Sequence, residues 1–132
     1  MTDKITSKDN PKIKALRALL KNRKERWESQ QFVVETPTHI TELIEKGAQC
    51  KAVFYTDSPP EKSPKETIQI TAELSTHIST LKTPPGTFGC FQIPTWPSFQ
   101  PERYPTLLVL DQIQNPANLG AIIRNAAAFN ID

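Results

Sequence analysis

The sequence lacks the features of a membrane-spanning or secreted protein. Its 132 residues contain no run of about 18 apolar residues, the length that a membrane-spanning helix needs. The N-terminus, MTDKITSKDN, has no apolar stretch of the kind found in a signal peptide. We therefore predict a cytoplasmic protein that has no membrane among its partners.

Cysteine, histidine and glycine are scarce. Cys50 and Cys90 have no metal-like spacing, and His39 and His77 have no cysteine or carboxylate partner at ligand spacing, so we predict no metal site. We expect both cysteines to be reduced, buried thiols, with a disulfide between them as the alternative. No glycines form the G-x-G-x-x-G or P-loop spacing, which makes a nucleotide-binding fold the weaker interpretation.

Positive charge is concentrated at the N-terminal end. The chain has 16 Lys and Arg against 14 Asp and Glu, but residues 1 to 30 hold nine basic and four acidic side chains. That segment carries a balance of +5 and the remainder −3. Such asymmetry favours a surface that binds an anion such as RNA, and a merely solvated helix face is the alternative.

The first expected helix carries this charge. Asp9 or Asn10 can cap it, Pro11 suits its first turn, and the pattern continues to about Trp27. At helical spacing, one side gathers apolar residues: Ile13, Leu16, Leu19, Leu20 and Trp27. Beside them runs a basic stripe, our candidate for RNA binding: Lys14, Arg17, Lys21 and Lys24.

Alternating strands and helices follow, which together predict a small α/β sandwich of roughly 95 residues. The expected strands are residues 31–35, 51–56, 67–71 and 88–93, and the expected helices are residues 38–46 and 72–81. Residues 94–105 contain four prolines and predict a linker. Its aromatic residues either stack on bases or fix the linker to a domain surface: Trp96, Phe99 and Tyr104.

The last segment, residues 106–130, predicts a strand, a polar loop and a helix. The apolar run Leu107–Leu110 is typical of a parallel strand that is buried on both faces. We expect Asn118 to cap a helix that begins near Gly120 and leaves backbone N–H groups available to a ligand. Arg124 lies outside the apolar arc of that helix, which consists of Ile122, Ile123, Ala126, Ala127 and Phe129.

Two segments resemble the SpoU (TrmH-type) RNA ribose 2'-O-methyltransferases. The first catalytic motif of that family is similar to Asp111, Pro116, Asn118, Gly120, Arg124 and residues 126–129 here, with Ala117 and Asn130 where glycine is usual. The family's substrate-binding domain is similar to the N-terminal part of this chain, with Thr36 in place of a glycine. The matching residues are Ile5, Ser7, Asn10, Pro11, Lys14, Leu16, Leu20 and 32–35.

The resemblance implies a fold, an activity and a cofactor. It implies that residues 1–93 form an RNA substrate-binding domain similar to certain ribosomal proteins, that residues 94–105 form the linker, and that residues 106–132 begin a SPOUT-type trefoil-knot domain. In the family, the knot binds S-adenosylmethionine and forms a homodimer. We therefore expect the cofactor-binding residues to follow residue 132, and the chain to be an N-terminal portion that binds rRNA or tRNA but is inactive alone.

By the same resemblance, Arg124 and Asn118 are the catalytic candidates. Arg124 would act with an RNA phosphate to activate the ribose hydroxyl, an electrostatic role that suits a permanently charged guanidinium. Asn118 would shape the catalytic loop. From the residues alone, a helix cap and a surface cation remain the alternatives, and a stand-alone RNA-binding module remains the alternative for the whole chain.

Overall fold

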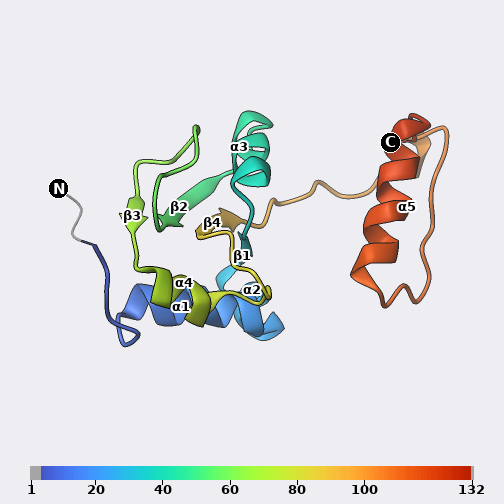
Figure 1. Cartoon of the computed structure of the whole chain (residues 1–132). Coiled ribbons are helices and arrows are strands. Elements are labelled where there is room, and N and C mark those ends of the chain that lie inside the picture. The colour runs from blue at the N-terminus through green and yellow to red at the C-terminus, as the bar shows by residue number, and fades with distance from the viewer. Residues whose placement is uncertain (1–3, 132) are drawn as a thin grey trace. The chain divides into compact units, whose positions relative to one another are not determined.

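The computed structural model describes residues 4–131 of the chain (Figure 1). They belong to two compact units, Met1–Thr95 and Trp96–Asp132. Among the described residues, no helix has the length and apolar character needed to cross a membrane.

The first unit is built on a mixed four-stranded sheet. Its strands are β1 (Gln31–Val34), β2 (Cys50–Tyr55), β3 (Thr67–Gln69) and β4 (Thr87–Gln92), and their order in the sheet is β1-β4-β2-β3. Strand β4 is antiparallel to both neighbours, whereas β2 and β3 are parallel. The four strands expected from the sequence are therefore present, with ends that shift by one or two residues.

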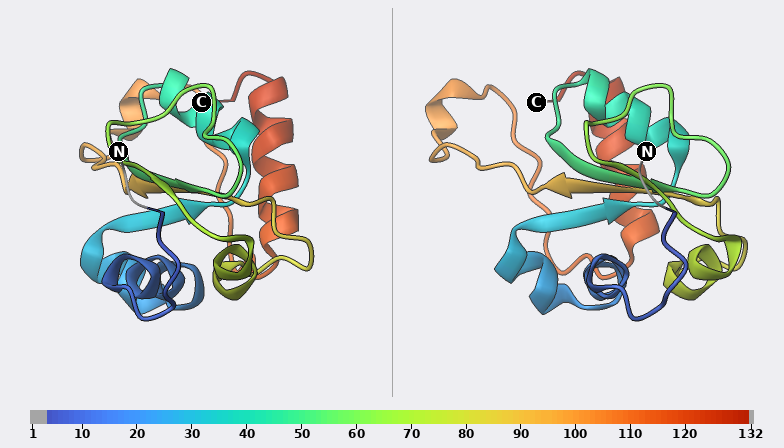
Figure 2. Two further views of the ribbon diagram at one scale, coloured as in Figure 1. Left: turned by 60° about the vertical axis from the view of Figure 1, so that its left-hand side comes forward. Right: turned by 90° about the vertical axis from the view of Figure 1, so that its left-hand side faces the viewer.

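Side chains alternate across the sheet, because successive residues of a strand point to opposite faces. Phe54 and Phe88 belong to the larger buried cluster on one face, and Val53 and Phe91 belong to the smaller cluster on the other. Figure 2 shows the resulting layers, with α1 (Pro11–Lys21), α2 (Arg23–Ser29) and α4 (Ala72–Ile78) on one side and α3 (Pro37–Glu45) on the other.

The helix predicted from Pro11 to Trp27 is in fact two helices, and that prediction was wrong. Asn22 adopts an extended conformation, φ −124° and ψ 114°, between α1 and α2. Its side-chain oxygen accepts a hydrogen bond from the backbone N–H of Lys24 at 2.9 Å, so it caps the second helix. Because the chain turns here, Trp27 leaves the apolar side of α1 and is 56% exposed.

Helix α3 packs closely on the sheet because β4 carries a glycine beneath it. A β-carbon added at Gly89 would lie 2.8 Å from Cγ1 of Ile40 and 2.8 Å from Cε2 of Phe91. Ile40 and Phe91 are both fully buried. The missing side chain thus lets Ile40 rest directly on the strand.

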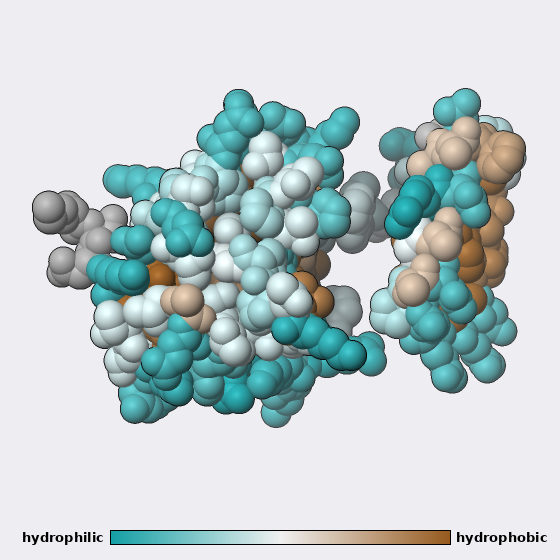
Figure 3. Space-filling model, viewed as in Figure 1, coloured by the Kyte–Doolittle hydropathy of each residue, from teal (hydrophilic) through white to brown (hydrophobic). Residues whose placement is uncertain are grey.

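The second unit contains α5 (Pro116–Ala128) and the short 3₁₀ turn η1 (Pro101–Arg103). The strand predicted at residues 107–110 is absent from the described part of the chain, and its four apolar side chains are exposed. The physical reason is that no other described strand lies in this unit to complete its hydrogen bonds. Figure 3 shows the exposed hydrophobic residues of this unit.

The start of α5 also differs from the prediction. The helix begins at Pro116, and its cap is Asn115, whose side-chain oxygen accepts from the N–H of Ala117 at 2.8 Å. Asn118 is therefore a residue of the first turn rather than the cap of a helix that begins near Gly120. In the Pro-rich segment, Phe99 and Tyr104 stack on each other with their ring centroids 5.8 Å apart.

Candidate nucleic-acid interface

A basic groove lies beside α1 in the first unit. It has a volume of about 490 Å³ and is lined by residues of α1, by the segment before α1, by the start of α2 and by His77 of α4. Both views of Figure 2 place α1 and α4 next to each other on the same side of the sheet. Figure 3 shows hydrophilic residues along this edge of the unit.

Three of the predicted cations line this groove together. Lys14, Arg17 and Lys21 follow one another at intervals of three and four residues, which places them on one side of α1. At 1.5 Å per residue they span about 10 Å along the helix axis. The fourth predicted residue, Lys24, lies on α2 beyond the break at Asn22 and forms an ion pair with Glu28 at 3.5 Å.

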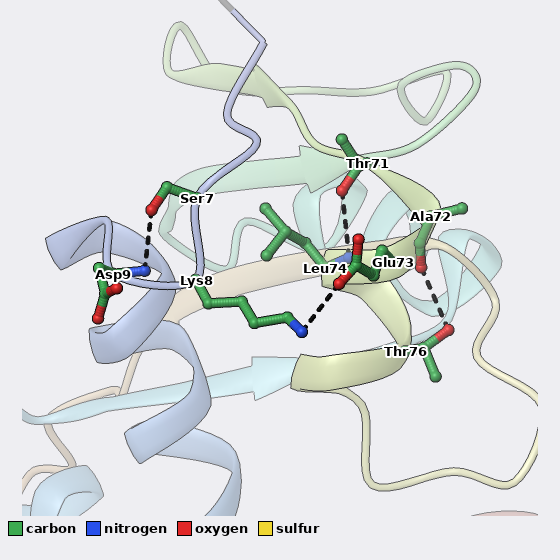
Figure 4. Close-up of polar contacts among 8 residues, drawn as sticks. All are labelled: Ser7, Lys8, Asp9, Thr71, Ala72, Glu73, Leu74 and Thr76. Atoms are coloured by element: carbon green, nitrogen blue, oxygen red, sulfur yellow. Dashed lines mark hydrogen bonds and ion pairs between the residues drawn. The ribbon is translucent and has the colours of Figure 1, made fainter.

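Local hydrogen bonds hold the walls of the groove in place. Asn10 caps α1 by accepting a hydrogen bond from the N–H of Lys12 at 2.9 Å. Thr71 caps α4 by accepting from the N–H of Leu74 at 3.2 Å (Figure 4). At the other end of α4, the buried carboxylate of Glu35 accepts hydrogen bonds from the hydroxyls of Ser79 and Thr80, and thereby joins the loop after α4 to the end of β1.

The groove includes two cationic or titratable residues that the sequence interpretation missed. Lys8 precedes α1 and forms an ion pair with Glu73 of α4 at 2.8 Å, drawn in Figure 4. His77 comes from α4 and lines the same groove as Arg17 and Lys21. Sequence periodicity relates residues within one helix only, so it contained no signal for a residue contributed by α4.

Electrostatic interactions in the groove shift three pKa values. Partial burial lowers the pKa of His77, and the neighbouring Arg17, Lys8 and Lys21 lower it further, while Glu73 opposes them. Hydrogen bonding to Lys8 lowers the pKa of Glu73, and hydrogen bonding to Lys14 lowers the pKa of Asp9. These directions are those of a site with an excess of positive charge.

One donor of a groove-lining residue lacks an acceptor. The Nε atom of Arg17 is buried, and no hydrogen-bond partner for it exists among the described residues. A buried donor without an acceptor typically costs about 1–3 kcal/mol, and more when the group is charged. An anion that reached this atom would remove this cost.

The catalytic candidates of the second unit do not form an enclosed site. Asn118 and Arg124 are both exposed on α5, and their spacing of six residues places them on different sides of the helix. No described residue between Trp96 and Ile131 is buried. These residues alone therefore do not fit S-adenosylmethionine, which requires a cavity that covers most of its surface.

The cysteines match the prediction of free thiols. Both are unpaired; Cys90 is buried, while Cys50 is only partly so. Burial raises the pKa of each thiol to about 11. In the described part of the chain, no cluster of three or more His, Cys, Asp or Glu residues has the arrangement of a metal site.

Comparison with known proteins gives consistent matches. A family model described as the MRM3-like substrate binding domain matches residues 10–89. The chain is 31% identical over 122 residues to rRNA methyltransferase 3, mitochondrial, of Xenopus laevis, and the match covers 83% of this chain and 29% of the relative.

Solved structures share the fold. The crystal structure of an RNA 2'-O ribose methyltransferase matches with a TM-score of 0.77 and 25% identity, over 98% of this chain and 53% of that one. An AdoMet-bound rRNA methyltransferase from Sinorhizobium meliloti matches with a TM-score of 0.78 and 24% identity, over 98% and 52%. The chain thus spans about half the length of these structures and less than a third of the Xenopus relative.

Proposed function

Because the chain belongs to the family of MRM3-like substrate-binding domains of SpoU/TrmH-type rRNA 2'-O-methyltransferases, we propose that its first unit binds the RNA substrate of such an enzyme. The RNA is an rRNA or a tRNA. The basic groove between α1 and α4 is the binding surface, and Lys14, Arg17 and Lys21 contact phosphates of the RNA backbone.

The observation that carries this proposal is the arrangement of cations around an unsatisfied donor. Three cations lie along about 10 Å of α1, which suits a chain of phosphates. The buried Nε of Arg17 has no acceptor among the described residues. A phosphate oxygen is a strong acceptor for a guanidinium, which binds phosphate with geometric specificity.

We further propose that the activity of the whole protein is methyl transfer from S-adenosylmethionine to a ribose 2'-hydroxyl. Arg124 would orient an RNA phosphate and stabilise the charge that develops as the hydroxyl loses its proton. Asn118 would hold the surrounding loop in place. The cofactor pocket and a homodimer interface would involve residues outside this sequence. The cytoplasmic location stays a prediction, and the Xenopus relative is named mitochondrial.

A second candidate is a stand-alone RNA-binding module. The first unit has its own hydrophobic core, and the groove is formed entirely by its residues. Such a module would bind RNA without methyl transfer, so the two candidates differ in cofactor binding and share the groove.

The experiment is an equilibrium titration of labelled structured RNA at two salt concentrations. The test variant combines Lys14→Glu, Arg17→Glu and Lys21→Glu. We expect this variant to bind RNA much more weakly. The slope of log affinity against log salt concentration should fall in magnitude by about 2, because each phosphate contact contributes roughly 0.7–0.9 to it.

A matched control variant separates a local site from net charge. It reverses three exposed cations in loops of the same unit: Lys62, Lys65 and Lys82. We expect it to keep most of the affinity and the salt slope. If both variants weaken binding equally, net charge alone explains the interaction and the groove is not the site.

A further inference from the structure

We infer that the groove holds one RNA phosphate between Arg17 of α1 and His77 of α4, and that His77 takes up a proton when the phosphate binds. This inference rests on the proposed function and adds a second wall to its site. It makes His77 a direct phosphate contact that strengthens as the pH falls.

Geometry places the two residues in one groove. Arg17 and His77 belong to helices that are distant in sequence, yet both line one groove. Arg17 supplies the buried donor that lacks an acceptor. A neutral imidazole supplies one N–H donor, and a protonated imidazole supplies two.

Burial and the surrounding charges both disfavour protonation of His77 in the free protein. The cations that line the groove with it are Lys8, Lys14, Arg17 and Lys21. The acidic side chains nearby are Asp9, Glu25 and Glu73, of which Asp9 pairs with Lys14 and Glu73 pairs with Lys8. Two of these three carboxylates are paired and the four cations outnumber them, so the excess positive charge disfavours an imidazolium.

A bound phosphate reverses this balance. Its negative charge compensates the cations, so the pKa of His77 rises from the lowered value that partial burial and Arg17 impose in the free protein. His77 then carries its proton in a larger fraction of the complex than of the free protein. Affinity must therefore increase as the pH falls through the range in which His77 titrates.

The chain offers a matched control for the test. Its other histidine, His39, is exposed on α3, which covers the opposite face of the sheet. RNA affinity of the 132-residue chain is measured between about pH 5.5 and about pH 8 at constant ionic strength. The wild-type chain should gain roughly three- to tenfold in affinity toward the acidic end, the equivalent of up to about one pKa unit.

The variants decide the assignment. His77→Ala and His77→Gln should both remove this pH dependence, while His39→Ala should keep it, and circular dichroism verifies that each variant is folded. In parallel, the ring signals of His77 in an NMR titration should report a higher pKa with RNA than without it.

The outcomes separate this inference from the proposed function. If His77→Gln keeps the pH dependence, or if RNA leaves the pKa of His77 unchanged, the inference is wrong even though the α1 cations still bind RNA. If the wild-type chain binds no structured RNA at low salt, the proposed function fails as well.

Discussion

Replacing Gly89 with alanine tests how closely α3 packs on the sheet. The added β-carbon would lie 2.8 Å from Cγ1 of Ile40, 2.8 Å from Cε2 of Phe91 and 3.1 Å from Cδ1 of Ile40. The two neighbours are fully buried, so they cannot move into solvent. Overpacking of this kind costs about 1–3 kcal/mol of folding free energy.

The expected loss is large enough to measure by thermal denaturation. For a domain of this size, each kcal/mol lowers the melting temperature by about 4–8 °C, so Gly89→Ala should melt roughly 4–24 °C below the wild type. Gly120→Ala is the control, because a β-carbon there meets no atom within 4 Å. It should leave the melting transition of the first unit unchanged.

A double-mutant cycle identifies the clash itself. Ile40→Ala removes both of the Ile40 atoms that the new β-carbon would approach, so Gly89→Ala should cost less in that background. Two results would refute the reasoning. One is a Gly89→Ala variant with the melting temperature of the wild type, and the other is a double variant whose stability loss equals the sum of the two single losses.

Asn22→Ala should lower the free energy of unfolding by about 1 kcal/mol in a urea titration, because α2 loses the cap that its first turn uses. Cys50 and Cys90 should react with iodoacetamide at neutral pH far more slowly in the native chain than in urea, because their pKa values of about 11 leave little thiolate; equal rates would contradict the burial. Arg124→Ala, tested in a form of the protein that transfers methyl groups, should lower the rate of methyl transfer on the order of a hundredfold and leave the melting temperature unchanged. Wild-type activity, or a parallel loss of stability, would reject the proposed role of Arg124. A polypeptide of residues 1–132 should give no calorimetric signal with S-adenosylmethionine, and micromolar binding would show that residues 96–131 form a site after all.

The strands of the first unit could be predicted because their signals are local. Each is a short run of apolar and β-branched or aromatic residues bounded by turn residues, as in Phe32–Val34 and Phe88–Phe91. The layer architecture follows from their alternation with helices. These signals require no knowledge of distant contacts.

The errors arose where a residue's role depends on its partners. Asn22 has ordinary polar character in sequence, and only its side-chain bond to Lys24 reveals that it ends one helix and begins the next. Leu107–Leu110 has the composition of a strand, yet a strand requires a neighbour to pair with. Asn118 was expected to cap the last helix because of its residue type, but the cap is Asn115, which precedes Pro116.

Only the part of the candidate site that lies on one helix could be predicted from the sequence. Lys14, Arg17 and Lys21 share one helix, so their spacing revealed a common face. His77 joins them only through the packing of α4 against α1, and Lys8 precedes α1 and so lies outside its helical periodicity. Lys24 was included because the helix was assumed to continue through Asn22.

The place of β4 in the sheet has a consequence for how the first unit is made. Strand β4 is last in the sequence but lies between β1 and β2, and Gln31 pairs with Gln92. During synthesis, β1 therefore has no strand to pair with until β4 has left the ribosome. Closing the long loop between β1 and β4 costs chain entropy before any contact compensates for it. Both buried clusters also need β4, which supplies Phe88 to one and Phe91 to the other. The domain should thus acquire its two layers in a single late step, and the groove between α1 and α4 should form only when that step is complete.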